Sequence, residues 1–322
     1  MKSLIGILVS ISILSVIIYK IGTKEFVHDF KNLDPLFLVL SILLIVPQIL
    51  VSAVRWRLIL EMHCPISLGK ATSVILASSS LNAVLPTKFG DFAKAVFHKT
   101  DGLELTKGIY LTIIEKALDF AALSLVLLIG ALLVPHHTNI IIIAILFSIM
   151  VIGITVFIFC FDVRKLAPYV KNSKIRRVNF DVLLIRWHEL MVKQKDCKRN
   201  LISIISLSVL FWYLYMAQVY LLFLSFHTSV SLVVILALVP ISIYISLLPI
   251  SFGGLGTREA SLIYLFSSYA PASIMASIGI LLSLRYFVPA LIGIPFLHSL
   301  GFSSKSEKDE LSEEPKKSDA AL

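Results

Sequence analysis

Charged side chains stand inside strongly apolar stretches of this chain, and their residue types could do chemistry there. Between residues 201 and 304 the acids and bases other than His and Tyr are Arg258, Glu259 and Arg285. A charge at the centre of a membrane costs about 2.5–3.5 kcal/mol even on lenient insertion scales, so each must face a partner or a wet cavity. The candidate site residues of the whole chain are Lys88, Asp91, Glu115, Asp119, Arg258, Glu259, Arg285 and the amide Asn82.

These residue types suit the binding of an anionic group. Arg donates two parallel hydrogen bonds to a phosphate, and the candidates for that role are Arg258, Arg285 and Lys88. Glu115 and Asp119 are four residues apart and share one helix face. With Glu259 they are candidates for charge balance or proton coupling. The alternative is a purely internal ion-pair network, for example Arg258 with Glu115, because buried pairs can be retained for specificity.

A short motif, Leu-Pro-x-x-Phe-Gly, interrupts the apolar stretches twice, at residues 85–90 and 248–253. Paired Pro/Gly interruptions at corresponding places in two halves are the best sequence indication of a transporter's binding site. Broken helix ends would add backbone N–H groups for an anion. The predicted hinge residues are Pro86, Gly90, Pro249, Gly253, Gly254 and Gly256.

The composition requires an integral membrane protein. The chain has 322 residues, of which 57% are hydrophobic and 15% charged, and its mean hydropathy is +0.92; a soluble domain cannot hide that much apolar surface. The net charge is +9, but Lys and Arg lie in loops, which indicates membrane orientation and contact with anionic lipid rather than nucleic acid. The three cysteines lack metal-ligand spacing, so no metal, disulfide framework or cofactor is expected.

The pattern predicts an all-α polytopic membrane protein with about six full spans and two re-entrant helical hairpins. The spans are residues 4–19, 36–54, 109–134, 139–161, 201–226 and 273–300. The hairpins are residues 71–99 and 231–270, although a full span followed by a loop is the alternative for the first. Arg55-Trp56-Arg57 is interpreted as an interfacial anchor of the second span.

The loop 162–200 is strongly basic, which places it in the cytoplasm. Counting outward from it, the first hairpin enters from the cytoplasm, the second from the exterior, and both termini are cytoplasmic. The halves 36–134 and 201–300 then form an inverted repeat within a membrane domain of residues 1–302, with the hairpin tips facing each other. The charged tail 303–322 lacks periodicity and is expected to be disordered.

Three motifs in order resemble the flippase-like family, also called the lysylphosphatidylglycerol synthase transmembrane-region family (UPF0104-like). They are Asn82-x-x-x-Pro86-x-x-x-Gly90-Asp91, Glu115-Lys116-x-x-Asp119 and Pro249-x-x-x-Gly253-Gly254-x-Gly256-x-Arg258-Glu259. Two positions depart from the family pattern, with Lys116 in place of Arg and Thr257 in place of an aliphatic residue. The resemblance implies a multi-span inner-membrane protein that moves modified lipids between leaflets. A stand-alone member without an aminoacyl-transferase domain is expected.

The function expected is therefore a flippase of the cell membrane that moves a modified anionic lipid: a glycolipid, a polyprenyl-phosphate-linked lipid or an aminoacylated phospholipid. The expected partners are this lipid substrate, anionic lipids at the 162–200 loop and cell-envelope biosynthesis proteins. Two alternatives remain open at this point. One is a membrane-embedded lipid-modifying transferase, and the other is a non-transporting scaffold for cell-envelope assembly. No ATP-binding loop of the G-x-x-x-x-G-K-[ST] type occurs, so any driving force is an ion gradient, the lipid gradient or a partner.

Overall fold

The computed structural model describes residues 2–134, 139–160, 174–175, 178–179, 187–189, 192, 198–248, 250–251 and 254–300. The first half comprises α1 (Lys2–Ile21), α2 (Thr23–Lys31), α3 (Pro35–Leu43), α4 (Ile45–Leu60), α5 (Leu68–Asn82), η1 (Pro86–Phe92), α6 (Ala93–Phe97), η2 (Lys99–Asp101) and α7 (Leu105–Leu133). There follow α8 (Asn139–Cys160), β1 (Lys174–Ile175), β2 (Val178–Asn179), α11 (Lys198–Ser225), α12 (Leu232–Leu247), α13 (Thr257–Leu265), α14 (Ala272–Leu282) and α15 (Leu284–Ser299). The predicted tail 303–322 and most of the predicted 162–200 loop lie outside the described residues. Within that loop, β1 and β2 pair antiparallel.

Four helical segments of the described chain are long and apolar enough to cross a membrane: Pro35–Leu60, Leu105–Leu133, Asn200–Ser225 and Ala272–Ser299. The first combines α3 and α4, and the last combines α14 and α15. Shorter apolar helical stretches lie at Leu8–Ile17, Ile141–Phe157 and Leu232–Leu247. The chain is therefore a polytopic helical membrane protein, and the count of six spans stays a prediction.

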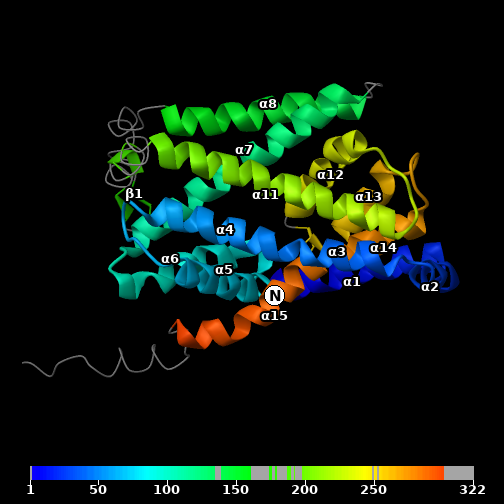
Figure 1. Ribbon diagram of the computed structural model, residues 1–322, viewed down its shortest axis with the longest axis horizontal. Coiled ribbons are helices and arrows are strands. Elements are labelled where there is room, and N and C mark those ends of the chain that lie inside the picture. Colours follow the sequence, from blue (N-terminus) through cyan, green and yellow to red (C-terminus); the bar gives the residue numbers. More distant parts are fainter. Residues whose placement is uncertain are drawn as a thin grey trace, which may run out of the picture.

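The pair α3–α4 runs antiparallel to α11. At one end of the bundle the backbone N–H of Asp34 donates to the carbonyl oxygen of Ser225 at 2.8 Å. At the other end the Asn200 side chain donates to Glu61. Figure 1 shows both elements along the long axis of the molecule. Since α5 follows α4 and α12 follows α11, the two predicted hairpins begin at opposite ends of the bundle.

The segment from α5 to η2 turns back on itself, so that η2 lies beside the beginning of α5. Lys70 at the beginning of α5 forms an ion pair with Asp101 in η2, and the Cys64 thiol lies 3.3 Å from the Asp101 carbonyl oxygen. Inside the turn, a β-carbon added to Gly90 would lie 2.5 Å from the backbone nitrogen of Asn82. Glycine at position 90 is therefore required by close backbone approach.

The segment from α12 to α13 also returns to its starting end. The rings of Phe223, near the end of α11, and Phe266, just after α13, lie 5.4 Å apart. Between the two helices the chain bends through Gly254 and Gly256, whose φ angles are +79° and +89°. Residues with a β-carbon rarely adopt these angles, which explains both glycines. In Figure 1, α12 and α13 lie toward the right and α5 and α6 toward the left.

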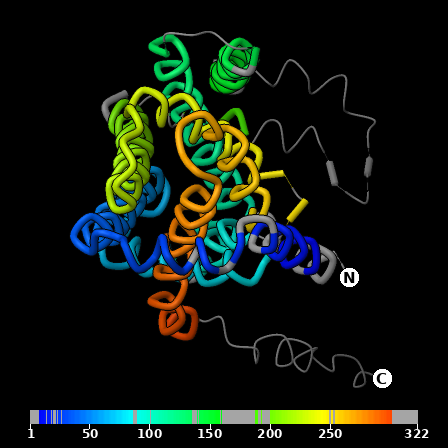
Figure 2. The backbone as a smooth tube through the Cα atoms, turned by 90° about the vertical axis from the view of Figure 1, so that its right-hand side faces the viewer, coloured from blue at the N-terminus to red at the C-terminus, as the bar shows by residue number. Residues whose placement is uncertain are grey.

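Each hairpin packs against the last helix of the opposite half. A β-carbon on Gly293 of α15 would lie 2.0 Å from the Leu76 carbonyl oxygen of α5, and one on Gly130 of α7 would lie 2.4 Å from the Ala237 nitrogen of α12. The Ser80 hydroxyl of α5 donates to the Ala290 carbonyl oxygen of α15 at 2.5 Å. Small residues at such crossings let helix backbones approach closely in lipid. Figure 2 looks along the bundle and shows α14 (orange) between α11 and α1, with α15 (orange-red) below them.

Candidate functional site

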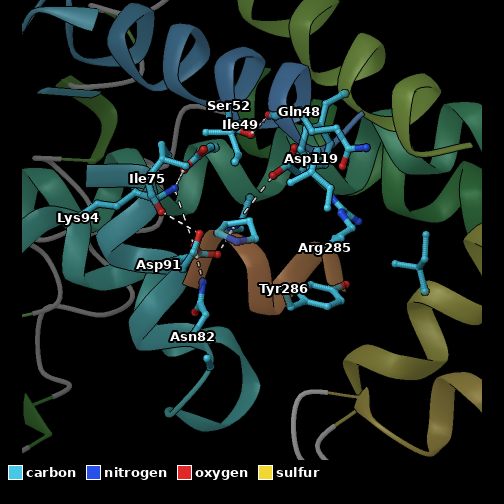
Figure 3. Close-up of a pocket in the computed structure, with 18 of the residues that line it drawn as sticks. Gln48, Ile49, Ser52, Ile75, Asn82, Asp91, Lys94, Asp119, Arg285 and Tyr286 are labelled. Atoms are coloured by element: carbon cyan, nitrogen blue, oxygen red, sulfur yellow. Dashed lines mark hydrogen bonds and ion pairs between the residues drawn. The ribbon is translucent and has the colours of Figure 1, made fainter. Parts of the chain in front are cut away.

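One cavity of about 510 Å³ lies between the two hairpins. Its charged lining comes from α4, the first hairpin, α7 and α15, while the second hairpin contributes apolar side chains. Figure 3 shows the labelled side chains converging on this space. The charged lining residues are Arg55, Asp91, Lys94, Glu115, Lys116, Asp119 and Arg285, and the neutral polar ones include Gln48, Ser52, Ser79 and Asn82.

Arg55 is the centre of the charged cluster. Its guanidinium donates to Glu115 Oε1 at 3.0 Å, to both carboxylate oxygens of Asp119 and to the Ser208 hydroxyl at 3.1 Å. Only 3% of Arg55 is exposed. The interpretation of this residue as an interfacial anchor is therefore wrong, since it pairs with two acids inside the bundle and only Arg57 of that basic pair is exposed.

Two lysines complete the cluster. Lys94 of α6 donates to Glu115 Oε2 at 2.7 Å, and Lys116 of α7 forms an ion pair with Asp91. The other Asp91 oxygen accepts a hydrogen bond from the Asn82 amide at 2.9 Å. Three cations therefore face three carboxylates, and these six residues are formally neutral together.

Arg285 is held differently. Its guanidinium carbon lies 4.1 Å from the ring centroid of Tyr215, 5.0 Å from that of Phe211 and 5.6 Å from that of Tyr286. Within the described part of the chain no carboxylate lies within 4.0 Å of it. The described lining therefore carries one excess positive charge, located at Arg285.

Arg258 and Glu259 form a separate buried pair at the start of α13. The guanidinium donates to Glu259 Oε1 at 2.6 Å, to the Gly279 carbonyl oxygen at 2.7 Å and to the Ser283 hydroxyl at 2.7 Å. The second Glu259 oxygen accepts from the Gly256 N–H at 2.6 Å, which caps the helix. Neither residue belongs to the cavity lining. This pair fixes α13 against α14, and Arg258 does not contact Glu115 in the way suggested for an internal network.

Of the residues predicted from sequence, the cavity brings together Asn82, Asp91, Glu115, Asp119 and Arg285. The Lys88 side chain, Pro249 and Gly253 lie outside what the structure describes. Sequence reasoning missed Arg55. The apolar run Leu58-Ile59-Leu60 continues the helix beyond Arg55, and it could have indicated that this charge lies inside the span rather than at its end. It also missed Phe211 and Tyr215 beside Arg285, because these two rings come from α11 and no local pattern connects α11 with α15.

Comparison with known proteins agrees with this architecture. The family described as "Lysylphosphatidylglycerol synthase TM region" matches residues 3–293. The chain belongs to this family. A relative from the archaeon Methanothermobacter thermautotrophicus (strain ATCC 29096 / DSM 1053 / JCM 10044 / NBRC 100330 / Delta H), described as "UPF0104 membrane protein", is 23% identical over 335 residues. The match covers 95% of this chain and 98% of that relative. The family resemblance seen in the three sequence motifs is therefore confirmed, and this family member is a multi-pass membrane protein.

Proposed function

We propose that this protein is a lipid flippase of the cell membrane, which moves a modified anionic lipid between leaflets. The observation that carries the proposal is the cavity of about 510 Å³ whose excess cation, Arg285, lies inside a bundle of membrane-spanning helices. An ionisable residue within a membrane-spanning segment that faces a cavity is a functional-site hypothesis by default. Candidate lipids are a glycolipid, a polyprenyl-phosphate-linked lipid and an aminoacylated phospholipid.

An inverted repeat of residues 36–134 and 201–300 is part of this proposal, with six spans and both termini in the cytoplasm. Three pairs of corresponding residues support it, because Leu85 and Leu248, Gly90 and Gly253, and Gly130 and Gly293 are each 163 positions apart. The antiparallel packing of α3–α4 on α11 starts the hairpins at opposite ends of the bundle. Inverted repeats of this kind place a transporter's binding site between the halves, and alternating access follows from one half rocking against the other.

In this mechanism the head group binds in the cavity while the acyl chains stay in the surrounding lipid. Arg285 binds the anionic group, and Asp91, Glu115 and Asp119 balance the charges of Arg55, Lys94 and Lys116. The six paired charges keep the cavity wet and preorganised without attracting a second anion. Movement of the hairpins would then expose the bound head group to one side of the membrane and afterwards to the other.

We further propose that the lipid leaves the protein chemically unchanged. Each described acid of the cavity lies within 4.0 Å of a cation, so none is presented as a free general acid or base. Mass spectrometry of lipid recovered after transport tests this point. A mass change that depends on the protein would favour a lipid-modifying transferase instead.

The experiment for transport is leaflet exchange in proteoliposomes that carry fluorescent lipids quenched from outside. The wild-type protein is expected to accelerate exchange of a phosphate-bearing lipid, and Arg285→Gln to reduce the rate about tenfold or more. Arg57→Gln is the matched control, because Arg57 is exposed and does not line the cavity. Exchange rates equal to those of protein-free vesicles across a panel of glycolipids, polyprenyl-phosphate lipids and phospholipids would contradict the proposal.

A further inference from the structure

We infer that the cavity selects a head group of net charge −1, in which one phosphodiester is joined to an uncharged hydroxylated remainder, and that it rejects head groups carrying an added ammonium. This inference rests on the proposed function and names its substrate class. The observations behind it are the charges of the lining, the way Arg285 is held, and the neutral polar side chains nearby.

The charges of the described lining leave one cation without a carboxylate. The described lining holds four cations and three carboxylates. Lys94 and Arg55 lie 2.7 and 3.0 Å from Glu115, Arg55 also pairs with Asp119, and Lys116 pairs with Asp91. One bound phosphodiester therefore neutralises the cavity. A head group that also carried an ammonium would find no unoccupied carboxylate among the described residues.

The packing of Arg285 prepares it for a phosphate. A guanidinium close to aromatic rings is attracted by them and keeps its full positive charge. With the Tyr215 centroid at 4.1 Å and the Phe211 centroid at 5.0 Å, the rings hold the group in place without neutralising it. Since the planar fork matches two phosphate oxygens, the incoming anion supplies the missing counter-charge.

Neutral polar side chains of the lining can bind the uncharged, hydroxylated part of the head group. Gln48, Ser52, Ser79 and Asn82 all line the cavity. The hydroxyls of Ser52 and Ser79 donate to carbonyl oxygens of their own helices, which leaves their oxygen atoms able to accept. Amide and hydroxyl groups of this kind exchange hydrogen bonds with sugar or glycerol hydroxyls. A volume of about 510 Å³ falls within the usual range for one small ligand, about 300–1,000 Å³, which favours a single sugar or polyol unit over a long oligosaccharide.

The test is a binding measurement on purified full-length protein in detergent, with Trp212 fluorescence as the readout because Trp212 lines the cavity. The probes are short-chain phosphatidylglycerol, its lysyl ester, short-chain phosphatidylcholine and free glycerol 3-phosphate. Phosphatidylglycerol is expected to bind at least about tenfold more tightly than each of the others. Trp212→Phe must abolish the signal, which shows that the readout reports this cavity.

Arg285→Gln is expected to remove the preference between phosphatidylglycerol and phosphatidylcholine, while Arg57→Gln keeps it. If Arg285→Gln fails to fold, Arg285→Lys serves instead, because it keeps the charge but loses the fork; the preference for net charge −1 should persist at weaker affinity. Equal affinity for phosphatidylglycerol and its lysyl ester, or an unchanged preference in a folded Arg285→Gln protein, would overturn the inference. Equal affinity for glycerol 3-phosphate would assign the site to a soluble anion and overturn it too.

The results for binding and for transport distinguish a failure of this inference from a failure of the proposed function. A head-group preference without leaflet exchange would keep this inference and remove the proposed function. Leaflet exchange that proceeds equally for phosphatidylglycerol and its lysyl ester would keep the proposed function and remove the inference.

Discussion

Gly130 and Gly293 stand 163 positions apart, and each meets the backbone of a hairpin helix from the opposite half of the chain. Gly130 of α7 faces Leu236 and Ala237 in α12, and Gly293 of α15 faces Leu76 in α5. These two crossings connect the halves through direct backbone contact. They also provide the clearest test of the packing.

Gly293→Leu is expected to lower stability by about 1–3 kcal/mol or more, because the new side chain has no space at the α5–α15 crossing. Gly153→Leu in α8 is the matched control, since an added β-carbon there meets nothing within 4 Å, and its effect should stay within about 0.5 kcal/mol. Thermal unfolding followed by fluorescence in one detergent measures both. Equal midpoints for the two variants would mean that the α5–α15 contact is absent.

Arg55→Met is expected to destabilise the protein by about 3–5 kcal/mol, because it leaves buried Asp119 without its main counter-charge and Glu115 with Lys94 alone. Adding Asp119→Asn to this variant should restore part of the loss, since it removes one of the two acids that Arg55 pairs with. A double-mutant cycle on unfolding free energies measures the coupling. Strictly additive effects would show that Arg55 and Asp119 do not interact.

Arg258 is expected to matter mainly for the stability of the fold, and Arg285 mainly for the selection of the head group. Arg258→Gln should lower the thermal midpoint strongly, because Glu259 remains buried at 1% exposure without its partner. Arg285→Gln loses aromatic contacts worth about 1–2 kcal/mol, yet it should abolish the head-group preference. Parallel melting and binding curves separate the two roles. A milder effect of Arg258→Gln than of Arg285→Gln on the midpoint would reverse the assignment.

The base of the first hairpin is expected to lose stability in mild acid through His98, which lies outside the four candidate spans. The Trp56 indole donates to His98 Nε2 at 3.0 Å, so the neutral ring carries its proton on Nδ1 and donates it to Asp101 at 2.9 Å. Burial lowers the pKa of His98 below its ordinary value of 6.5, a shift that nearby Lys70 and Lys94 favour and Asp101 opposes.

Because the unfolded chain binds this proton more readily than the folded one, stability is full above pH 6.5 and falls as the pH drops below it. Melting midpoints between pH 5 and pH 8 should therefore show a decline in acid that His98→Gln diminishes. Asp101 also titrates, but hydrogen bonds from Lys70 and His98 lower its pKa despite partial burial, so its own loss comes at more acidic pH. A pH profile that His98→Gln leaves unchanged would exclude this role.

The sequence predicted the helical membrane class and much of the cavity for a physical reason. Charges in apolar stretches are costly enough that Asp91, Glu115, Asp119 and Arg285 had to meet polar surroundings, and the described cavity contains all four. The interruptions at Gly90 and Gly256 also marked real turns, one with close backbone approach and one with positive φ.

Partner identity could not be predicted in the same way. Arg258 pairs with its own neighbour Glu259, whereas Glu115 and Asp119 pair with Arg55, which lies 60 and 64 positions away. Such pairings depend on how α4 and α7 cross, and composition does not encode that crossing. The aromatic support of Arg285 by Tyr215 likewise depends on the placement of α11 against α15.

The exchange of hairpin contacts between the halves has a consequence for biogenesis. Ser80 and its acceptor Ala290 are separated by 210 positions, so the ribosome completes most of the chain before α15 exists to receive α5. During that interval the face of α5 that later meets α15 lacks this packing partner. The α5–α15 contact is therefore completed late in synthesis, and truncation before α15 should yield a chain that quality-control proteases remove.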